Sequence, residues 1–225
     1  MIKPKKVVVI APHPDDEVLG LGATISRFTS MKIEVSVLVV SGHLPPLYDK
    51  SSFDITKKEA EKSFEIMNVS NWEFLEIPAT TVHKIPVAEL NSKISKFLQY
   101  HKPDWVFIPF PDRHIDHRTI FDASVVCCRP NVKDYPKVVL AYETLSETHW
   151  NVPGIEPGFI PDLFIDTSNH MNQKEKALKS YNSQIEGNQS RSVEASKALA
   201  KFRGSQNGCD YAEAFKIIRL IKKNN

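Results

Sequence analysis

Two short motifs carry the side chains of this chain that are best suited to chemistry. The first is Ala-Pro-His-Pro-Asp-Asp-Glu at residues 11–17, and the second is His-Ile-Asp-His at residues 114–117. Two imidazoles and one carboxylate form a ligand set that suits zinc and leaves a fourth position open for water. We therefore expect His13, Asp16 and His117 to hold one divalent ion, with Asp15 left free to act as a base. Fe²⁺, Co²⁺ and Mn²⁺ accept the same donors.

Each motif alone also has a purely structural interpretation. The Asp-Asp-Glu run could cap the following helix and complement its dipole. A histidine at the end of a strand is most often simply hydrogen-bonded. What favours chemistry is the recurrence of the same residue types in both motifs, each at a predicted strand-to-helix turn.

The elements that position the two motifs are predicted strands rich in Val and Ile. Residues 6–11 and 33–40 form nearly continuous apolar runs, which is typical of strands buried on both faces of a parallel sheet. The first motif directly follows the strand at 6–11, and the second lies just past a further predicted strand at 104–109. Ligands of open α/β sheets bind at the carboxyl ends of the strands, so both motifs should meet at that edge if the two strands are neighbours.

The rest of the chain continues the alternation of strands and helices. This predicts a Rossmann-like, doubly wound α/β fold with a mostly parallel sheet and helices on both faces, as a single domain over residues 1–225. The segment 146–161 is rich in Pro, Gly and aromatic residues and is expected to be a loop near the site. Further strands are predicted at 33–40, 72–77, 138–142 and 163–165, and helices after Glu17 and at 56–67, 86–101, 119–128, 173–181, 192–201 and 211–222.

Composition narrows the function classes. The net charge of +2 is too balanced to indicate a nucleic-acid or membrane surface. No apolar window is long enough for a membrane span, and no signal peptide is apparent, so we expect a cytoplasmic protein. The three cysteines lack any Cys-x-x-Cys spacing, which argues against a zinc ribbon or a redox motif. The glycines after the first strand do not form a dinucleotide-binding fingerprint.

The two histidine motifs resemble those of the PIG-L/LmbE-like zinc-dependent de-N-acetylase family, which includes enzymes of glycosylphosphatidylinositol, mycothiol and bacillithiol biosynthesis. Later segments are similar as well: Ala-Tyr-Glu at 141–143, Phe-Ile-Asp-Thr at 164–167 and Tyr-Asn-Ser-Gln at 181–184. Phe-Arg-Gly at 202–204 and Tyr-Ala-Glu-Ala-Phe at 211–215 extend the resemblance to the end of the chain.

The resemblance implies a role for each site residue. Zinc is expected on His13, Asp16 and His117, and Asp15 corresponds to the general base. His114 corresponds to the residue that, as imidazolium, stabilises the oxyanion and helps the amine to leave. Asp116 is then expected to hydrogen-bond that imidazole and keep it charged. The implied reaction removes the N-acetyl group from an N-acetylated amino sugar or sugar conjugate and releases acetate.

Two departures from the family pattern concern the substrate. The family's substrate-binding arginine is replaced near Thr56, where Lys57 or Lys58 is a hypothetical substitute. The glycine-rich loop after the second strand becomes residues 43–49, with His43 a candidate for the pocket wall. The alternative function is a non-catalytic sugar- or metal-binding protein on the same scaffold. Intact Asp15 and His114 disfavour this alternative. The expected partner is a small-molecule substrate, and a homo-oligomer is a candidate assembly.

Overall fold

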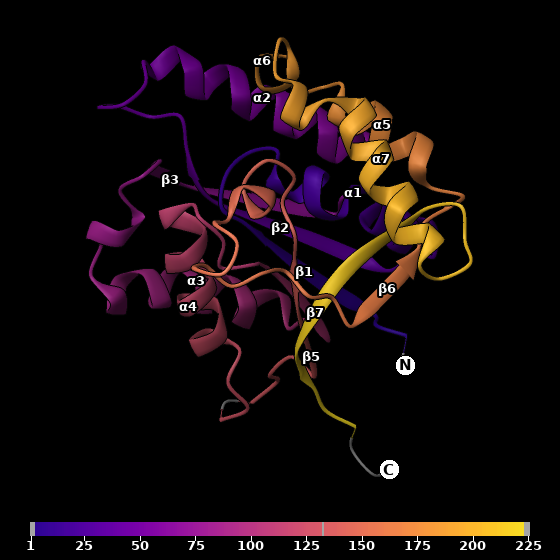
Figure 1. Ribbon diagram of the computed structural model, residues 1–225. Coiled ribbons are helices and arrows are strands. Elements are labelled where there is room, and N and C mark those ends of the chain that lie inside the picture. The colour runs from indigo at the N-terminus through magenta and orange to yellow at the C-terminus, as the bar shows by residue number, and fades with distance from the viewer. Residues whose placement is uncertain (1–2, 132, 223–225) are drawn as a thin grey trace.

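A seven-stranded sheet forms the centre of the computed structural model, which describes residues 3–131 and 133–222 (Figure 1). Its strand order is β3-β2-β1-β4-β5-β7-β6, and only β7 runs antiparallel to its neighbours. This confirms the expected mostly parallel, doubly wound α/β fold. The strands are β1 (Lys6–Ala11), β2 (Glu34–Gly42), β3 (Asn71–Pro78), β4 (Trp105–Pro109), β5 (Val138–Tyr142), β6 (Leu163–Asp166) and β7 (Ala212–Leu220).

Helices cover both faces of the sheet, as Figure 1 shows. One face carries α1 (Asp16–Ser30), α2 (Lys50–Ile66), α5 (Met171–Leu178), α6 (Asn182–Ile185) and α7 (Val193–Ser205), and the other carries α3 (Val87–His101) and α4 (Ile115–Cys127). Three short 3₁₀ helices complete the described chain: η1 (Val82–Lys84), η2 (Thr148–Trp150) and η3 (Gln189–Arg191).

The strand β1 shows why the sheet needs two helical layers. Its side chains alternate, so that Val7 and Val9 enter the core beneath α1 and α2, while Val8 and Ile10 enter the core beneath α3 and α4. All four are essentially inaccessible to solvent. Burial of apolar surface on both faces fixes this strand in the middle of the sheet.

The last element is a strand, which corrects the helix predicted at 211–222. The Ala-Glu-Ala start of this segment favours a helix locally, but β7 pairs with β5 on one side and β6 on the other. Phe215 and Ile217 join one core, and Ile218 joins the other, so the segment has the two-residue period of a buried strand. Tertiary pairing therefore overrides a weak helix propensity.

Two predicted helices begin earlier than expected. The helix predicted at 56–67 starts at Lys50, and it ends as predicted before Asn68, which adopts a left-handed backbone with φ 53°. The helix predicted at 119–128 starts at Ile115, because the His114 side chain accepts a hydrogen bond from the backbone N–H of Asp116 and caps the helix. The second motif therefore forms the first turn of α4.

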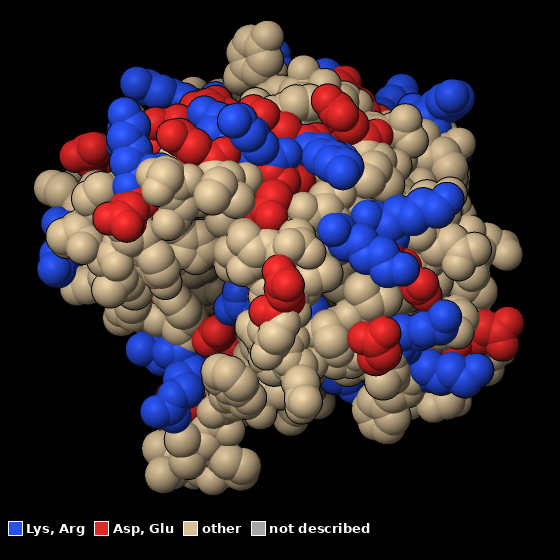
Figure 2. All heavy atoms as spheres, turned by 90° about the horizontal axis from the view of Figure 1, so that it is seen from above, with Lys and Arg blue, Asp and Glu red and all other residues tan. Residues whose placement is uncertain are grey.

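The described surface agrees with the balanced composition. On the face that carries α2, α5 and α7, acidic and basic side chains are interspersed (Figure 2). Within residues 3–131 and 133–222, no helix combines the length and the apolar character needed to cross a membrane. The three cysteines are free thiols.

Candidate metal centre and active site

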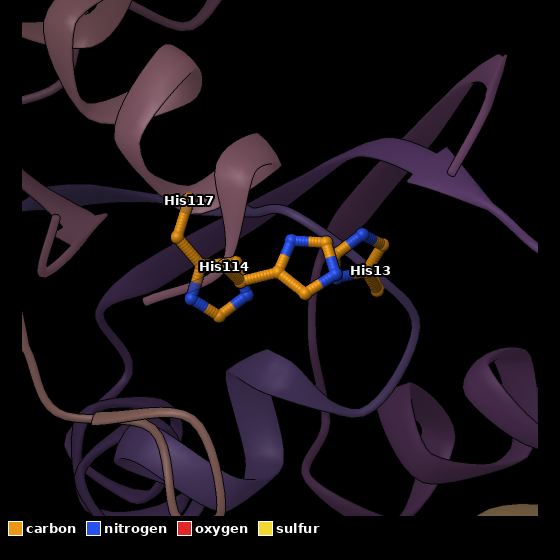
Figure 3. Close-up of side chains that lie close together, drawn as sticks. All are labelled: His13, His114 and His117. Carbon is orange, nitrogen blue, oxygen red and sulfur yellow. The ribbon is translucent and has the colours of Figure 1, made fainter. Parts of the chain in front are cut away.

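The two motifs meet at the switch point of the sheet. Strands β1 and β4 are parallel neighbours, although β2 and β3 lie between them in the sequence. The chain winds outward from β1 to β3, returns to β4 and continues in the other direction, which is where open α/β sheets bind ligands. His13 from the end of β1 lies beside His114 and His117 from the start of α4 (Figure 3).

One carboxylate oxygen lies between the imidazoles of His13 and His117. Asp16 Oδ2 is 3.1 Å from His13 Nδ1 and 3.2 Å from His117 Nε2. The backbone N–H of His13 also donates to this oxygen, at 2.9 Å. The structure therefore brings together the three residues that the sequence identified as a ligand set.

Each of these two histidines has a second carboxylate on its other ring nitrogen. His13 Nε2 is 3.0 Å from Asp116 Oδ2, and His117 Nδ1 is 3.0 Å from Asp112 Oδ2. Such carboxylate partners fix the tautomer and orientation of metal-binding histidines. They leave Nδ1 of His13 and Nε2 of His117 facing Asp16.

Two observations indicate that these side chains could hold a divalent ion. His117 Nε2 is buried and lies 3.2 Å from Asp16 Oδ2, but it makes no hydrogen bond among the described residues, which leaves this nitrogen available to bind an ion. One ring nitrogen from each of His13, His114 and His117 also lies within 4.8 Å of the other two, a set in which His114 stands in place of Asp16. Two imidazoles and a carboxylate suit zinc, so the fit supports a metal without identifying it.

Carboxylates dominate the charge state of the two imidazoles. Burial lowers the pKa of His13, but hydrogen bonds to Asp116 and Asp16 outweigh it and raise the pKa to about 9. Burial likewise opposes protonation of His117, while Asp16 and Asp112 raise its pKa to about 10. The pKa of Asp16 is lowered well below its usual range because the two imidazoles outweigh its burial. Without an ion, the positive charge resides on the histidines.

Asp15 occupies a strained and buried position next to His13 and Asp16. Its φ of 110° lies in the left-handed region, and only 2% of the residue is exposed. Strain of this kind is concentrated at functional sites. Burial raises the pKa of Asp15 to about 7, while the nearby Arg191 guanidinium opposes this shift. A carboxyl group that titrates near neutral pH can both take up and release a proton.

The sequence indicated only that Glu17 begins a helix, but in the structure its side chain also supports the turn before α1. It is fully buried, accepts a 2.5 Å hydrogen bond from the Tyr181 hydroxyl and accepts another from the backbone N–H of Asp15. Burial raises its pKa to about 8. The side chain thus supports the strained backbone of Asp15.

The expected pairing of the Asp116 carboxylate with His114 is not what the structure shows. That carboxylate lies against His13 and accepts a hydrogen bond from the backbone N–H of Thr80, at 2.6 Å. His114 Nδ1 accepts instead from the backbone N–H of Asp116, so its proton lies on Nε2. Burial, followed by the charges of His13 and His117, lowers the pKa of His114 to about 4. In the metal-free protein His114 is therefore a neutral imidazole with its proton on Nε2.

Two loops form the rim of the site. In the 43–49 loop, His43 packs edge-on against Tyr48, with ring centroids 4.4 Å apart, and its buried Nδ1 has no partner among the described residues. In the 146–161 loop, the hydroxyl of Thr148 donates to Asp112 Oδ2, at 2.8 Å. This confirms that the second loop lies next to the site.

One proposed substitute for the family's arginine has a partner of its own. Lys57 Nζ pairs with Glu76 at 2.9 Å and lies over the rings of Phe53 and Phe74. These contacts give the lysine a structural role on the surface of α2 and β3.

Sequence reasoning missed Asp112 and Arg191. Asp112 could have been found, because a carboxylate two residues before His114 at a strand end is a natural partner for a metal-binding histidine. Arg191 carries no such signal. Its guanidinium is 2.9 Å from Asp15 Oδ2, yet the two residues lie 176 positions apart in the sequence.

Comparison with known proteins identifies the matching family. Residues 8–128, more than half of the chain, match the family described as PIG-L: GlcNAc-PI de-N-acetylase. A diacetylchitobiose deacetylase of Thermococcus kodakarensis is 27% identical over 237 aligned positions, which cover 95% of this chain and 83% of the relative.

Solved structures with the same architecture include two different chemistries. The N,N'-diacetylchitobiose deacetylase of Pyrococcus horikoshii superposes with a TM-score of 0.75 and 25% identity, over 96% of this chain and 84% of the other. The 4-carboxy-2-hydroxymuconate hydratase of Pseudomonas putida superposes with a TM-score of 0.76 and 17% identity, over 98% and 99%. The second likeness concerns the fold alone, so the reaction must be argued from the site.

Proposed function

The chain belongs to the PIG-L family, and from this premise we propose that it is a metal-dependent hydrolase that removes the N-acetyl group from an amino sugar or sugar conjugate. The observation that carries the proposal is the pair of histidines turned onto Asp16, each backed by a carboxylate, beside the buried Asp15. A metal, a base and a hydrogen-bond donor in one place meet the requirements of amide hydrolysis.

His13, Asp16 and His117 would hold the ion, and zinc is the metal that we favour for this set. When bound, the ion would supply Lewis acidity, which lowers the pKa of a water molecule and polarises an amide carbonyl. Asp112 and Asp116 would hold the two imidazoles in their ligating orientation.

Asp15 is proposed to move the protons. It takes a proton from water as the water oxygen attacks the acetyl carbonyl carbon, and it later gives that proton to the sugar nitrogen as the C–N bond breaks. Acetate and a free amine are the products. The raised pKa of Asp15, about 7, suits both steps, because the ideal catalytic pKa is close to the working pH.

His114 is proposed to stabilise the oxyanion with its Nε2–H. The hydrogen bond from the backbone of Asp116 to Nδ1 fixes this tautomer. A preorganised donor of this kind contributes about 3–4 kcal/mol to the barrier reduction. We therefore assign His114 the part of a neutral donor, and we assign Asp116 to the support of His13.

The rim supports a carbohydrate-type substrate. The relatives in Thermococcus and Pyrococcus are named for diacetylchitobiose, a doubly N-acetylated compound. In this chain, Tyr48 and Trp150 are 39% and 59% exposed on the two rim loops. Exposed aromatic rings bind the apolar faces of ligands, so we propose a substrate in which a further group beyond the acetylated sugar contacts the rim.

The proposal is tested by acetate release from N-acetylglucosamine, N,N'-diacetylchitobiose, a sugar nucleotide and an N-acetylglucosamine conjugate, with metal content measured on the same sample. We expect release from at least one of them, abolished by a chelator and restored by zinc. Stoichiometric metal with no release from any compound would favour the alternative, a non-catalytic sugar- or metal-binding protein.

A further inference from the structure

A guanidinium from a distant segment contacts the proposed base. Arg191, at the end of η3, donates from Nη1 to Asp15 Oδ2 at 2.9 Å. The same side chain donates from Nε to Ser146 Oγ at 3.0 Å and from Nη2 to Glu147 Oε1 at 3.2 Å. One residue thus joins the metal-binding turn, the 146–161 loop and the segment before α7.

Two of the backbones that Arg191 joins are strained. Asp15 has φ 110° and Ser146 has φ 83°. Residues other than glycine rarely adopt positive φ values of this kind. Such conformations persist only where surrounding contacts over-determine them. The planar guanidinium offers five donors in a fixed arrangement, so it can hold both segments at a set separation.

The contact makes the two oxygens of the Asp15 carboxylate inequivalent. Oδ2 accepts from Arg191 Nη1, and Oδ1 is the oxygen that this guanidinium does not hold. A carboxylate held by one oxygen presents the other in a defined direction. A base needs that definition, because proton transfer requires hydrogen-bond geometry with the attacking water.

The backbone N–H of Thr148 donates to the carbonyl of Thr144 at 3.0 Å, so residues 144–148 form a turn that contains both loop contacts of Arg191. We propose that Arg191 is a positioning residue for the base: it holds Oδ2 of Asp15 and fixes this turn, so that Oδ1 is presented to the attacking water. The inference rests on the proposed hydrolytic function. It assigns Arg191 no contact with substrate, and it predicts an effect on turnover rather than on binding.

A second arginine of this chain provides a matched control. Arg203 on α7 donates to the two oxygens of buried Glu143, at 2.8 and 2.7 Å, and lies over the rings of Phe159 and Phe202. It is also a largely buried arginine paired with a carboxylate, but it contacts neither the base nor the ligand set. Its substitution reports what the loss of a structural arginine does by itself.

The kinetic test compares Arg191→Ala and Arg191→Lys with Arg203→Ala. Misplacement of a reacting group by about 1 Å costs on the order of 100-fold in rate, so we expect kcat of Arg191→Ala to fall by about that factor. KM and metal content should stay nearly unchanged, added guanidinium ion should restore part of kcat, and Arg191→Lys should retain an intermediate rate. Arg203→Ala should show no rescue. An increase in KM with unchanged kcat would place Arg191 on the substrate and overturn the proposal.

Amide hydrogen exchange of the metal-free protein gives a readout that does not depend on activity. In Arg191→Ala, residues 144–148 and 186–192 should exchange faster, whereas in Arg203→Ala the segment 186–192 should keep its protection. Unchanged exchange in Arg191→Ala would overturn the inference. If the unsubstituted protein released no acetate, the proposed function would fail, and the exchange experiment would still decide whether Arg191 holds these segments together.

Discussion

Two buried ionic clusters lie at opposite ends of the first half of α1, and they differ in how well their polar atoms are paired. The site cluster consists of His13, Asp16, Asp112, Asp116 and His117. The second, which we call the α1 clamp, consists of Lys174 on α5 and Glu213 on β7, both at most 4% exposed.

Both charged groups of the α1 clamp have hydrogen-bond partners. Helix α1 is interrupted at Leu21, where φ is −148°. Lys174 Nζ donates to the carbonyl of Leu19 at 2.8 Å and to Glu213 Oε1 at 2.7 Å. Glu213 accepts from the backbone N–H groups of Ala23 and Thr24, which begin the second half of the helix. The clamp therefore supplies the hydrogen bonds that the interruption removes from the helix.

The site cluster retains unpaired atoms instead. His117 Nε2 and Asp116 Oδ1 are buried without hydrogen-bond partners among the described residues, and the pKa values of His13 and His117 are strongly raised. Unpaired buried polar atoms cost stability, so a protein retains them where a ligand completes the set. Both clusters contain buried charged groups, and they differ in how completely these groups are hydrogen-bonded.

The largest expected effect is on the base next to the site cluster. Asp15→Asn removes the proton acceptor but keeps the shape of the side chain, so the rate of acetate release should fall by about 10²–10⁴-fold. Bound metal should remain stoichiometric, because Asp16, His13 and His117 are unchanged. Measurement of acetate release and metal content on the same preparation checks both. Normal turnover would rule out Asp15 as the base.

The next effect concerns the α1 clamp. Glu213→Gln leaves Lys174 as a buried charge without its partner, which should lower the free energy of unfolding by about 3–5 kcal/mol. Urea denaturation of the metal-free protein measures this loss, with Glu65→Gln on the exposed face of α2 as the control. Because the clamp is structural in our interpretation, the folded variant should still bind metal. Loss of metal binding with unchanged stability would break the comparison.

A smaller effect is expected for the carboxylate behind His117. Asp112→Asn removes the charge that orients this imidazole, and such partners are worth about 10–100-fold in metal affinity. Competition with a chelator of known affinity measures the change. Asp122→Asn, on the exposed side of α4, should leave the affinity unchanged. Equal affinities for both variants would mean that Asp112 does not support the ligand.

The last effect is the dependence of metal affinity on pH, which tests the ligand set without any substitution. In the metal-free protein the pKa values of His13 and His117 are raised to about 9 and about 10, so an ion must displace their protons. Affinity should therefore rise with pH by about tenfold per unit for each proton displaced, and level off once both imidazoles are neutral. Calorimetry in buffers of different ionisation enthalpy counts the released protons. Affinity that is independent of pH would contradict this ligand set.

Much of the site could be predicted because its residues lie in short motifs at strand ends. His13, Asp15 and Asp16 share one turn, and His114 and His117 share the first turn of α4. Adjacent residues at a strand-to-helix turn stay together whatever the rest of the chain does. Only the pairing of β1 with β4 was needed to join the two groups.

The roles of Asp116 and Arg191 could not be predicted in this way. The sequence places Asp116 beside His114, but the start of α4 turns its carboxylate toward His13. Arg191 reaches Asp15 only because η3 folds back over the site. Both depend on side-chain directions that are set by packing between segments far apart in the chain.

The sequence by itself determined the alternation of strands and helices, the carboxyl edge as the place where the two motifs lie, and the residues that we propose as ligand set and base. These follow from local periodicity and from the spacing of a few residues. The tertiary structure alone decided that residues 212–220 form a strand, which carboxylate supports which imidazole, and which arginine holds the base. The physical reason is that strand pairing and buried hydrogen bonds are long-range contacts, whose free energy outweighs the local preferences visible in a sequence.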